Sequence, residues 1–171
     1  MSYKEEIAMS KKRILFLCTH NSCRSQMAEG LANYFFSEKL HAQSAGSEPE
    51  YVHPLAIKVM KELGIDISSQ RSKSVMEFFG QEFDYVITLC ELEPGKGSCP
   101  AFIGRVGQLL TWKFPDPASA GGSEEQRLKV FRQVRDAIKE KLEKWINGDY
   151  SLSDTSTDAL VFSPVESEPE E

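Results

Sequence analysis

The chain has 171 residues, of which 40% are hydrophobic and 27% charged, a balance typical of a soluble globular protein with one core. Its apolar runs fall far short of the roughly 20 residues that span a bilayer. The start MSYKEEIAMSKKR contains acidic residues and no long apolar stretch, which is unlike a signal peptide. These features argue against a membrane protein and predict a cytoplasmic one, whose thiols stay reduced.

The net charge of −6 is concentrated at the C-terminal end. Seven acidic residues and no Lys or Arg lie between positions 149 and 171, and removing these seven from −6 leaves +1 for the rest. No concentrated basic face is visible in the sequence, so we expect no nucleic-acid partner.

The first predicted strand covers residues 11–18, where Ile14 to Leu17 form the continuous apolar run of a buried parallel strand. Polar residues 19–25 follow it. A helix is expected next, because four apolar side chains share one helical face: Met27, Leu31, Tyr34 and Phe35. Residues 41–45 predict a second short strand, closed by Gly46.

The middle of the chain predicts a helix over 54–63, a short helix over 74–79 and a buried strand over 83–90. In the first of these, Pro54 fits the first turn and Gly64 marks the end. Residues 91–108 contain several Gly and Pro and predict a loop, long enough to suggest a functional role.

The last part of the chain predicts a strand over 111–114 and then a long helix. Ser123 and Gln126 form a capping-box pattern at the start of this helix, and Asn147-Gly148 ends it. Its apolar stripe consists of Leu128, Phe131, Val134, Ile138, Leu142 and Trp145.

Strands that alternate with helices indicate an α/β fold, a parallel sheet with helices packed on its faces. Ligands of such sheets bind beyond the carboxyl ends of the strands. Cys18, Cys90 and Asp116 each follow a predicted strand, so three reactive groups should meet at this edge.

The stretch from Cys18 to Ser25 has the pattern Cys-x5-Arg-Ser between a strand and a helix. Backbone N–H groups of the loop can surround a tetrahedral oxyanion, and Arg24 can bind two of its oxygens. The positive potential should lower the pKa of Cys18 and make it a thiolate, to which Ser25 could donate a hydrogen bond. The loop positions concerned are Thr19, His20, Asn21, Ser22 and Cys23.

Each of these residues also has a structural interpretation. An inert Cys18 at a strand end is disfavoured by the strand–loop–helix context. Cys23 is expected to be a small filler, and His20 a loop position rather than a base, because a thiolate needs none. His41 and His53 are expected on the surface or in packing contacts.

Residues 18–30, CTHNSCRSQMAEG, closely resemble the active-site loop shared by low-molecular-weight tyrosine phosphatases and thioredoxin-coupled arsenate reductases. Further similarity to the reductases lies in SAG (44–46), GIDIS (64–68), VITLC (86–90), Cys99-Pro100 and FPDPA (114–118). The resemblance covers about residues 11–147. It implies a low-molecular-weight phosphatase-like fold, a three-layer sandwich around a four-stranded parallel sheet.

Both reactions begin with attack by Cys18 on a tetrahedral oxyanion, while an acid, here Asp116 between two prolines, protonates the leaving oxygen. A phosphatase then needs only water, whereas arsenate must gain two electrons, which a dithiol supplies. Cys90 could attack Cys18 and Cys99 could resolve the disulfide, as the resemblance also implies. We expect arsenate as substrate, phosphate and sulfate as mimics, and thioredoxin as electron donor, with glutaredoxin as the alternative.

Other interpretations of these cysteines are weaker. The Cys spacings lack the Cys-x2-Cys pair of a zinc site. The remaining alternative is that Cys90 and Cys99 are unpaired structural thiols with no redox role. Phosphatases of this fold usually carry an aromatic pair after the acid, where this chain has Ala118 and Ser119. A tyrosine phosphatase is therefore the second hypothesis, and a non-catalytic oxyanion-binding or redox-sensing module the third.

Two positions depart from the reductase pattern. Eight residues separate Cys90 from Cys99, where the family commonly has six. Reductases that bind potassium carry an Asp where this chain has Lys73, whereas Asn21, Glu29 and Ser44 match the other ligand positions. The hypothesis is that the Lys73 ammonium replaces the cation, the alternative being a lysine in solvent.

Taken together, the sequence predicts a flexible segment over residues 1–10, a catalytic domain over 11–148 and an acidic, disordered tail over 149–171. We expect a cytoplasmic monomer that uses no metal and no cofactor and has no membrane partner.

Overall fold

The computed structural model describes residues 11–92, 94–148 and 150, so the predictions for residues 1–10 and for the tail beyond residue 150 lie outside the described residues. The elements in chain order are β1 (Lys12–Cys18), α2 (Arg24–Phe35), β2 (Leu40–Gly46), α3 (Pro54–Lys61), η1 (Val75–Phe78), β3 (Glu82–Thr88), β4 (Arg105–Thr111), η2 (Pro117–Ser119) and α4 (Glu124–Asn147). No helix of this described part is long and apolar enough to cross a bilayer.

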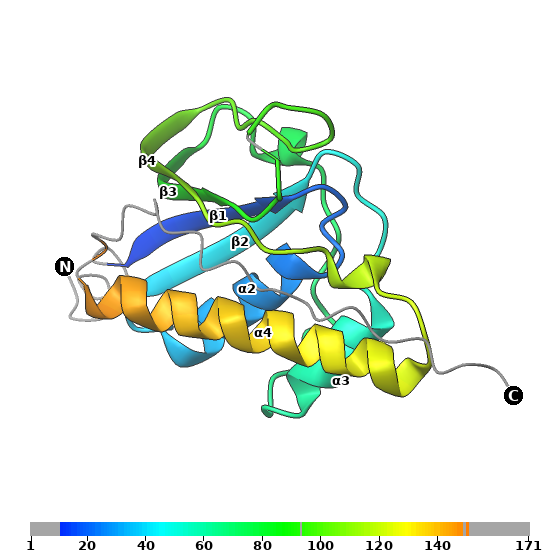
Figure 1. Cartoon of the computed structure of the whole chain (residues 1–171). Coiled ribbons are helices and arrows are strands. Elements are labelled where there is room, and N and C mark those ends of the chain that lie inside the picture. Colours follow the sequence, from blue (N-terminus) through cyan, green and yellow to red (C-terminus); the bar gives the residue numbers. More distant parts are fainter. Residues whose placement is uncertain (1–10, 93, 149, 151–171) are drawn as a thin grey trace, which may run out of the picture.

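The four strands form one parallel sheet in the order β2-β1-β3-β4 (Figure 1). In the register, Cys18 lies opposite Gly46 and Leu17 opposite Thr88, and Thr88 lies opposite Thr111. The carboxyl ends of all four strands therefore meet at one edge, as the sequence predicts.

The two faces of the sheet are covered differently. On one face, Ile14 and Phe16 of β1 share a core with the three α-helices, which pack against one another (Figure 1). On the other face, Leu15 and Leu17 pack with Phe78 of η1. The predicted three-layer α/β fold is confirmed, and its second outer layer is a short 3-10 helix with adjoining loops.

The predicted apolar stripe of α4 is confirmed, since all six of its members are buried. Burial of each of these side chains contributes roughly 1.5–3 kcal/mol. The capping box is also present: Ser123 Oγ accepts from the Gln126 backbone N–H, and Gln126 Oε1 accepts from the Ser123 N–H at 2.8 Å. This long helix contacts η2, the short helix that Asp116 caps.

The prediction for the fourth strand is wrong, because β4 spans Arg105–Thr111 instead of residues 111–114. β4 lies at the sheet edge and is mostly exposed, so it lacks the apolar run that marks a buried strand. Its Gly107 lies against β3, where an added Cβ would come within 2.5 Å of the Asp84 carbonyl oxygen. The apolar residues after it, including fully buried Trp112, leave the sheet and pack against α4.

Two members of the predicted apolar face of α2 also differ from the prediction. Met27 and Leu31 are buried, but Tyr34 and Phe35 are 54% and 41% exposed. The end of α2 extends beyond the core, where the Phe35 ring is covered by the Lys139 ammonium at 4.9 Å. The other predicted elements agree within a few residues at their ends.

Candidate active site

The anion loop, residues 18–25, connects β1 to α2 and passes close to the end of β2. A Cβ at Gly46 would lie 2.5 Å from the Thr19 carbonyl oxygen and 2.8 Å from the Asn21 nitrogen, so only glycine lets the loop take this course. Asn21 has φ 46°, a left-handed conformation that asparagine tolerates. Sheet and loop are thus fixed to one another through backbone atoms.

The hydrogen bonds around Cys18 have a defined direction. Asn21 Nδ2, which can only donate, lies 2.8 Å from Ser25 Oγ. Ser25 Oγ lies 2.8 Å from Cys18 Sγ, and its own O–H is therefore free to donate to the sulfur. Asn21 therefore orients the Ser25 hydroxyl toward the sulfur of Cys18.

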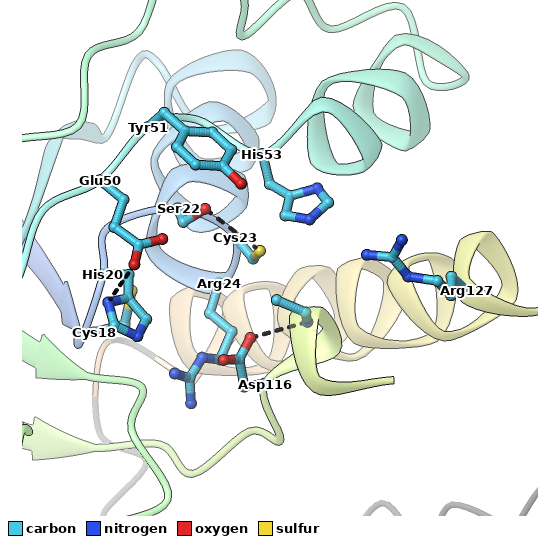
Figure 2. A pocket seen from close by; sticks show the side chains of 11 residues that line it. Cys18, His20, Ser22, Cys23, Arg24, Glu50, Tyr51, His53, Asp116 and Arg127 are labelled. Atoms are coloured by element: carbon cyan, nitrogen blue, oxygen red, sulfur yellow. Dashed lines mark hydrogen bonds and ion pairs between the residues drawn. The ribbon is translucent and has the colours of Figure 1, made fainter. Parts of the chain in front are cut away.

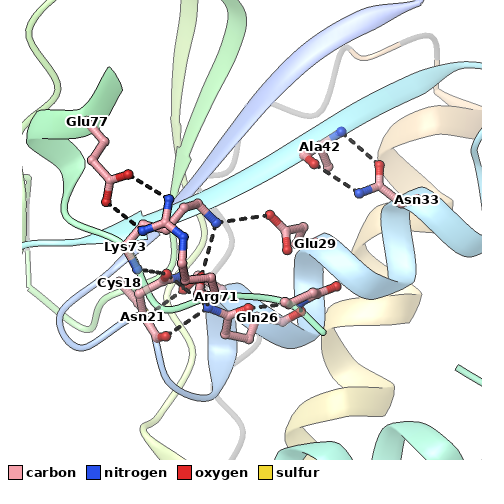
Figure 3. A network of polar contacts seen from close by, with 11 residues as sticks. Cys18, Asn21, Gln26, Glu29, Asn33, Ala42, Arg71, Lys73 and Glu77 are labelled. Atoms are coloured by element: carbon pink, nitrogen blue, oxygen red, sulfur yellow. Dashed lines mark hydrogen bonds and ion pairs between the residues drawn. The ribbon is translucent and has the colours of Figure 1, made fainter. Parts of the chain in front are cut away.

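A network of amide side chains braces the loop from behind (Figure 3). Asn21 Oδ1 accepts from Gln26 Nε2 and from the Lys73 backbone N–H, both at 2.9 Å. Gln70 Nε2 in turn donates to Gln26 Oε1 at 2.8 Å. Sequence reasoning missed Gln26 and Gln70, since glutamine in a helix or loop carries no signal of its own. The network fixes Asn21 and through it the Ser25 hydroxyl.

Arg24 and Asp116 meet at the same edge of the sheet (Figure 2). Arg24 is buried, and its Nη1 donates to the carbonyl oxygens of Leu89 and Phe114 at 3.4 and 3.0 Å. Its remaining N–H groups are available for an oxyanion in the loop. Asp116 Oδ1 accepts from the Ala118 N–H at 3.0 Å and so caps η2, which holds the carboxyl group in place.

Three of the four free cysteines form one buried cluster: Cys18, Cys90 and Cys99 are 2%, 3% and 3% exposed and lie in contact with one another. Burial raises the pKa of Cys90, and burial together with neighbouring Cys90 raises the pKa of Cys99 to about 12. Cys23 packs in the main core, where burial raises the pKa of its thiol strongly. Despite its eight-residue spacing, the loop returns Cys99 to Cys18 and Cys90.

Around this site lies a pocket of about 260 Å³ (Figure 2). It is lined by Cys18, His20, Ser22, Cys23, Arg24, Glu50, Tyr51, His53, Asp116, Ala118 and Arg127. Within the described residues, no group of three or more His, Cys, Asp or Glu is arranged to hold a metal ion.

Comparison with known proteins agrees with this geometry. The family model of low molecular weight phosphotyrosine protein phosphatases matches residues 13–156. An arsenate reductase of Halalkalibacterium halodurans is 45% identical over 134 residues, which are 78% of this chain and 94% of the relative. A glutaredoxin arsenate reductase of Synechocystis sp. is 40% identical over 135 residues, 79% of this chain and 96% of the relative.

The chain belongs to the low molecular weight phosphotyrosine protein phosphatase family. Among solved structures, an arsenate reductase in its phosphate-binding state has a TM-score of 0.67 and 39% identity, and the match covers 80% of this chain and 98% of that one. A thioredoxin-dependent arsenate reductase of Corynebacterium glutamicum has a TM-score of 0.55 and 26% identity, over 85% of this chain and 67% of that one. Within the family, this chain therefore groups with arsenate reductases.

Several pocket residues of this family member were not expected from the sequence. His53 was expected on the surface or in packing; it instead lines the pocket and caps α3, its Nδ1 accepting from the Leu55 N–H at 3.1 Å. Glu50, Tyr51 and Arg127 were not singled out. No sequence pattern marks these residues as part of a site, because only the fold brings Glu50 and Tyr51 to the same pocket as Arg127.

Lys73 points inward beneath the phosphatase-type loop (Figure 3). Its Nζ lies 3.7 Å from Glu29 Oε1 and 3.2 Å from the Arg71 carbonyl oxygen, and its side chain is 12% exposed. Burial raises the pKa of Glu29, while Lys73 and then Ser44 act in the opposite direction. The alternative prediction, that the Lys73 side chain lies in solvent, is therefore wrong. Of Asn21, Glu29 and Ser44, the residue that the ammonium group contacts is Glu29.

We expect activity and melting temperature to be unchanged when sodium replaces potassium at constant ionic strength, because the Lys73 ammonium already balances Glu29. Lys73→Asp should create a potassium dependence, since it adds a carboxylate ligand and removes the positive charge. Lys39→Asp, which makes the same charge change at an exposed position, serves as the control. A saturable rise in the melting temperature of the unaltered protein, specific to potassium, would contradict this.

Proposed function

We propose that the chain reduces arsenate to arsenite through a relay of Cys18, Cys90 and Cys99, and that thioredoxin returns it to the reduced state. The observation that carries this proposal is the cluster of three buried thiols at the anion loop. Hydrolysis of a phosphate ester needs one cysteine and water, whereas reduction of arsenate needs a dithiol as the source of two electrons.

In the first step, the oxyanion occupies the loop and the Cys18 thiolate attacks arsenic. A sulfur–arsenic bond forms, an arsenic–oxygen bond breaks, and Asp116 donates a proton so that the oxygen leaves as water. Ser25 stabilises the thiolate before attack, and Arg24 balances the charge of the oxyanion. The raised pKa values of Cys90 and Cys99 keep these two groups as thiols, which leaves the first attack to Cys18.

In the second step, Cys90 loses its proton and its sulfur attacks Cys18 Sγ. The sulfur–arsenic bond breaks and its electron pair stays on arsenic, so arsenic(V) becomes arsenic(III) and arsenite leaves. Cys99 then attacks Cys90, which releases the Cys18 thiolate and leaves a Cys90–Cys99 disulfide. The balance is two thiols oxidised to one disulfide for each arsenate reduced, with one water formed.

The electron donor is tested by measuring arsenite in parallel assays. One contains NADPH, thioredoxin reductase and thioredoxin; the other contains NADPH, glutathione reductase, glutathione and glutaredoxin. An intramolecular Cys90–Cys99 disulfide is a substrate of the type that thioredoxin reduces, so we expect sustained turnover in the first assay. The names of relatives include both donors, and turnover only with glutaredoxin would replace the thioredoxin part of the proposal while leaving arsenate reduction in place.

A phosphatase activity is the second candidate, because the anion loop, Arg24 and Asp116 also suit a phosphate ester. We expect slow hydrolysis of p-nitrophenyl phosphate by the unaltered protein and by Cys90→Ser, since this reaction needs no second thiol. Release of p-nitrophenol is the measurement. The control is Asp116→Asn, which keeps the N-cap of η2 but cannot donate the proton to the leaving group, and it should be slower. Fast hydrolysis with a strong preference for phosphotyrosine peptides would reverse the ranking of the two functions.

A further inference from the structure

The pocket is larger than a single tetrahedral oxyanion requires. Its volume of about 260 Å³ is just below the range for drug-sized ligands, whereas arsenate has only five heavy atoms. Cys18 and Arg24 lie at one side of the pocket, and Arg127 reaches in from α4 at the other, with His53 of the α3 cap beside it (Figure 2). The relay uses neither Arg127 nor His53.

The side chain of Arg127 has no ion pair or hydrogen bond within the part of the chain that the structure describes, and its Nε atom is buried without a partner. Two other arginines of α4 differ from it, because Arg132 and Arg135 both bind Glu62 at 2.8–2.9 Å. An unpartnered buried donor on a charged group is unfavourable. A guanidinium left in this state beside a pocket indicates that an anion completes its hydrogen bonds.

His53 supplies a second donor next to Arg127. Its Nδ1 accepts from the Leu55 N–H, so the proton of the neutral ring is on Nε2. Burial and the charge of Arg127 lower the pKa of His53, and Asp116 offsets part of this effect. The lowered pKa keeps the ring neutral, with Nε2–H as a donor. Of the carboxylates that line the pocket, Glu50 is paired with His20 at 3.5 Å and Asp116 caps η2.

We propose that Arg127 and His53 form an outer anion subsite, which captures the arsenate oxyanion before it moves to the anion loop around Cys18. This inference rests on the proposed function for the identity of the oxyanion. Because Arg127 contacts the oxyanion before the chemical step and not in it, the subsite raises the rate at which arsenate reaches the loop, which lowers KM and leaves kcat unchanged.

The first test is steady-state kinetics of arsenate reduction by Arg127→Gln. We expect KM for arsenate to rise about tenfold, equivalent to about 1.4 kcal/mol, with kcat within twofold of the unaltered protein. Arg127→Lys, which keeps the charge, should recover most of the loss. The matched control is Arg105→Gln, which removes an exposed charge at the opposite end of the sheet. A similar rise in the KM of Arg105→Gln would indicate a general charge effect. A fall in the kcat of Arg127→Gln at unchanged KM would indicate a role in the chemical step. Either result overturns the subsite.

The second test does not depend on arsenate reduction. With the phosphate of 4-carboxyphenyl phosphate in the anion loop, its carboxylate extends toward the outer subsite. We expect Arg127→Gln to lower kcat/KM for this ester at least fivefold more than for unsubstituted phenyl phosphate. Equal losses for the two esters overturn the subsite even if arsenate is reduced. A selective loss supports it even if the unaltered protein forms no arsenite, in which case only the proposed function fails.

Discussion

Cys18→Ser should lower arsenate reduction and aryl phosphate hydrolysis by a factor on the order of 10⁴ or more, comparable to the removal of other catalytic nucleophiles. Ser25 and Asn21 are arranged to stabilise a sulfur anion at this position. A serine hydroxyl does not ionise there at neutral pH, so the same contacts stabilise nothing reactive. Arsenite formation and p-nitrophenol release, measured on one preparation, give both losses.

Cys23→Ser is the matched control for this experiment. It makes the same substitution five residues away, at a thiol that burial keeps protonated and that takes no part in the relay. We expect it to retain activity within a few-fold. Turnover by Cys18→Ser in a preparation free of contaminating enzyme would show that Cys18 is not the nucleophile.

Cys99→Ser should form one equivalent of arsenite and then stop. Without the resolving thiol, the protein remains as a Cys18–Cys90 disulfide, in which the nucleophile is blocked. Arsenite per mole of enzyme in the presence of thioredoxin measures the stoichiometry, and peptide mapping after arsenate treatment locates the disulfide.

Cys23→Ser again serves as the control, because it removes one thiol yet should cycle normally. The expected single turnover also depends on Cys99 lying within the cluster rather than free on the surface, as its 3% exposure indicates. Normal cycling by Cys99→Ser would mean that thioredoxin attacks the first disulfide directly and that the longer loop serves another purpose.

The parts of the site that could be predicted from the sequence are those encoded locally. The anion loop needs a cysteine, an arginine and a serine at fixed spacing between a strand and a helix, and the capping box of α4 needs two residues three positions apart. The edge of the sheet could also be predicted, because parallel strands place their carboxyl ends together. Cys90 is placed correctly by this rule, whereas Asp116 lies in the pocket although the strand predicted just before it is not there.

What the sequence does not reveal depends on contacts between distant segments. β4 lies at a sheet edge and is mostly exposed, so its sequence, with polar residues and Gly107, lacks the apolar pattern of a strand. The apolar residues after it have that pattern but lie outside the sheet. Arg127 lies one turn into α4, one position before Leu128 of the buried stripe, and only the packing of α4 against α3 brings it to His53. Lys73 is one lysine among many until the fold places Glu29 beside it.

The close approach of Gly46 constrains the anion loop, whereas the segment that leads to Cys99 lies on the surface. Backbone contact with β2 and the amide network of Gln26 and Gln70 leave the loop that carries Cys18 no alternative course. Residues 94–98, in contrast, lie mostly exposed, and Ser47 Oγ reaches them with a hydrogen bond to the Ser98 carbonyl oxygen. In the proposed relay, we therefore expect the rearrangement that brings the disulfide to the surface to fall on the segment of Cys99 and not on the anion loop.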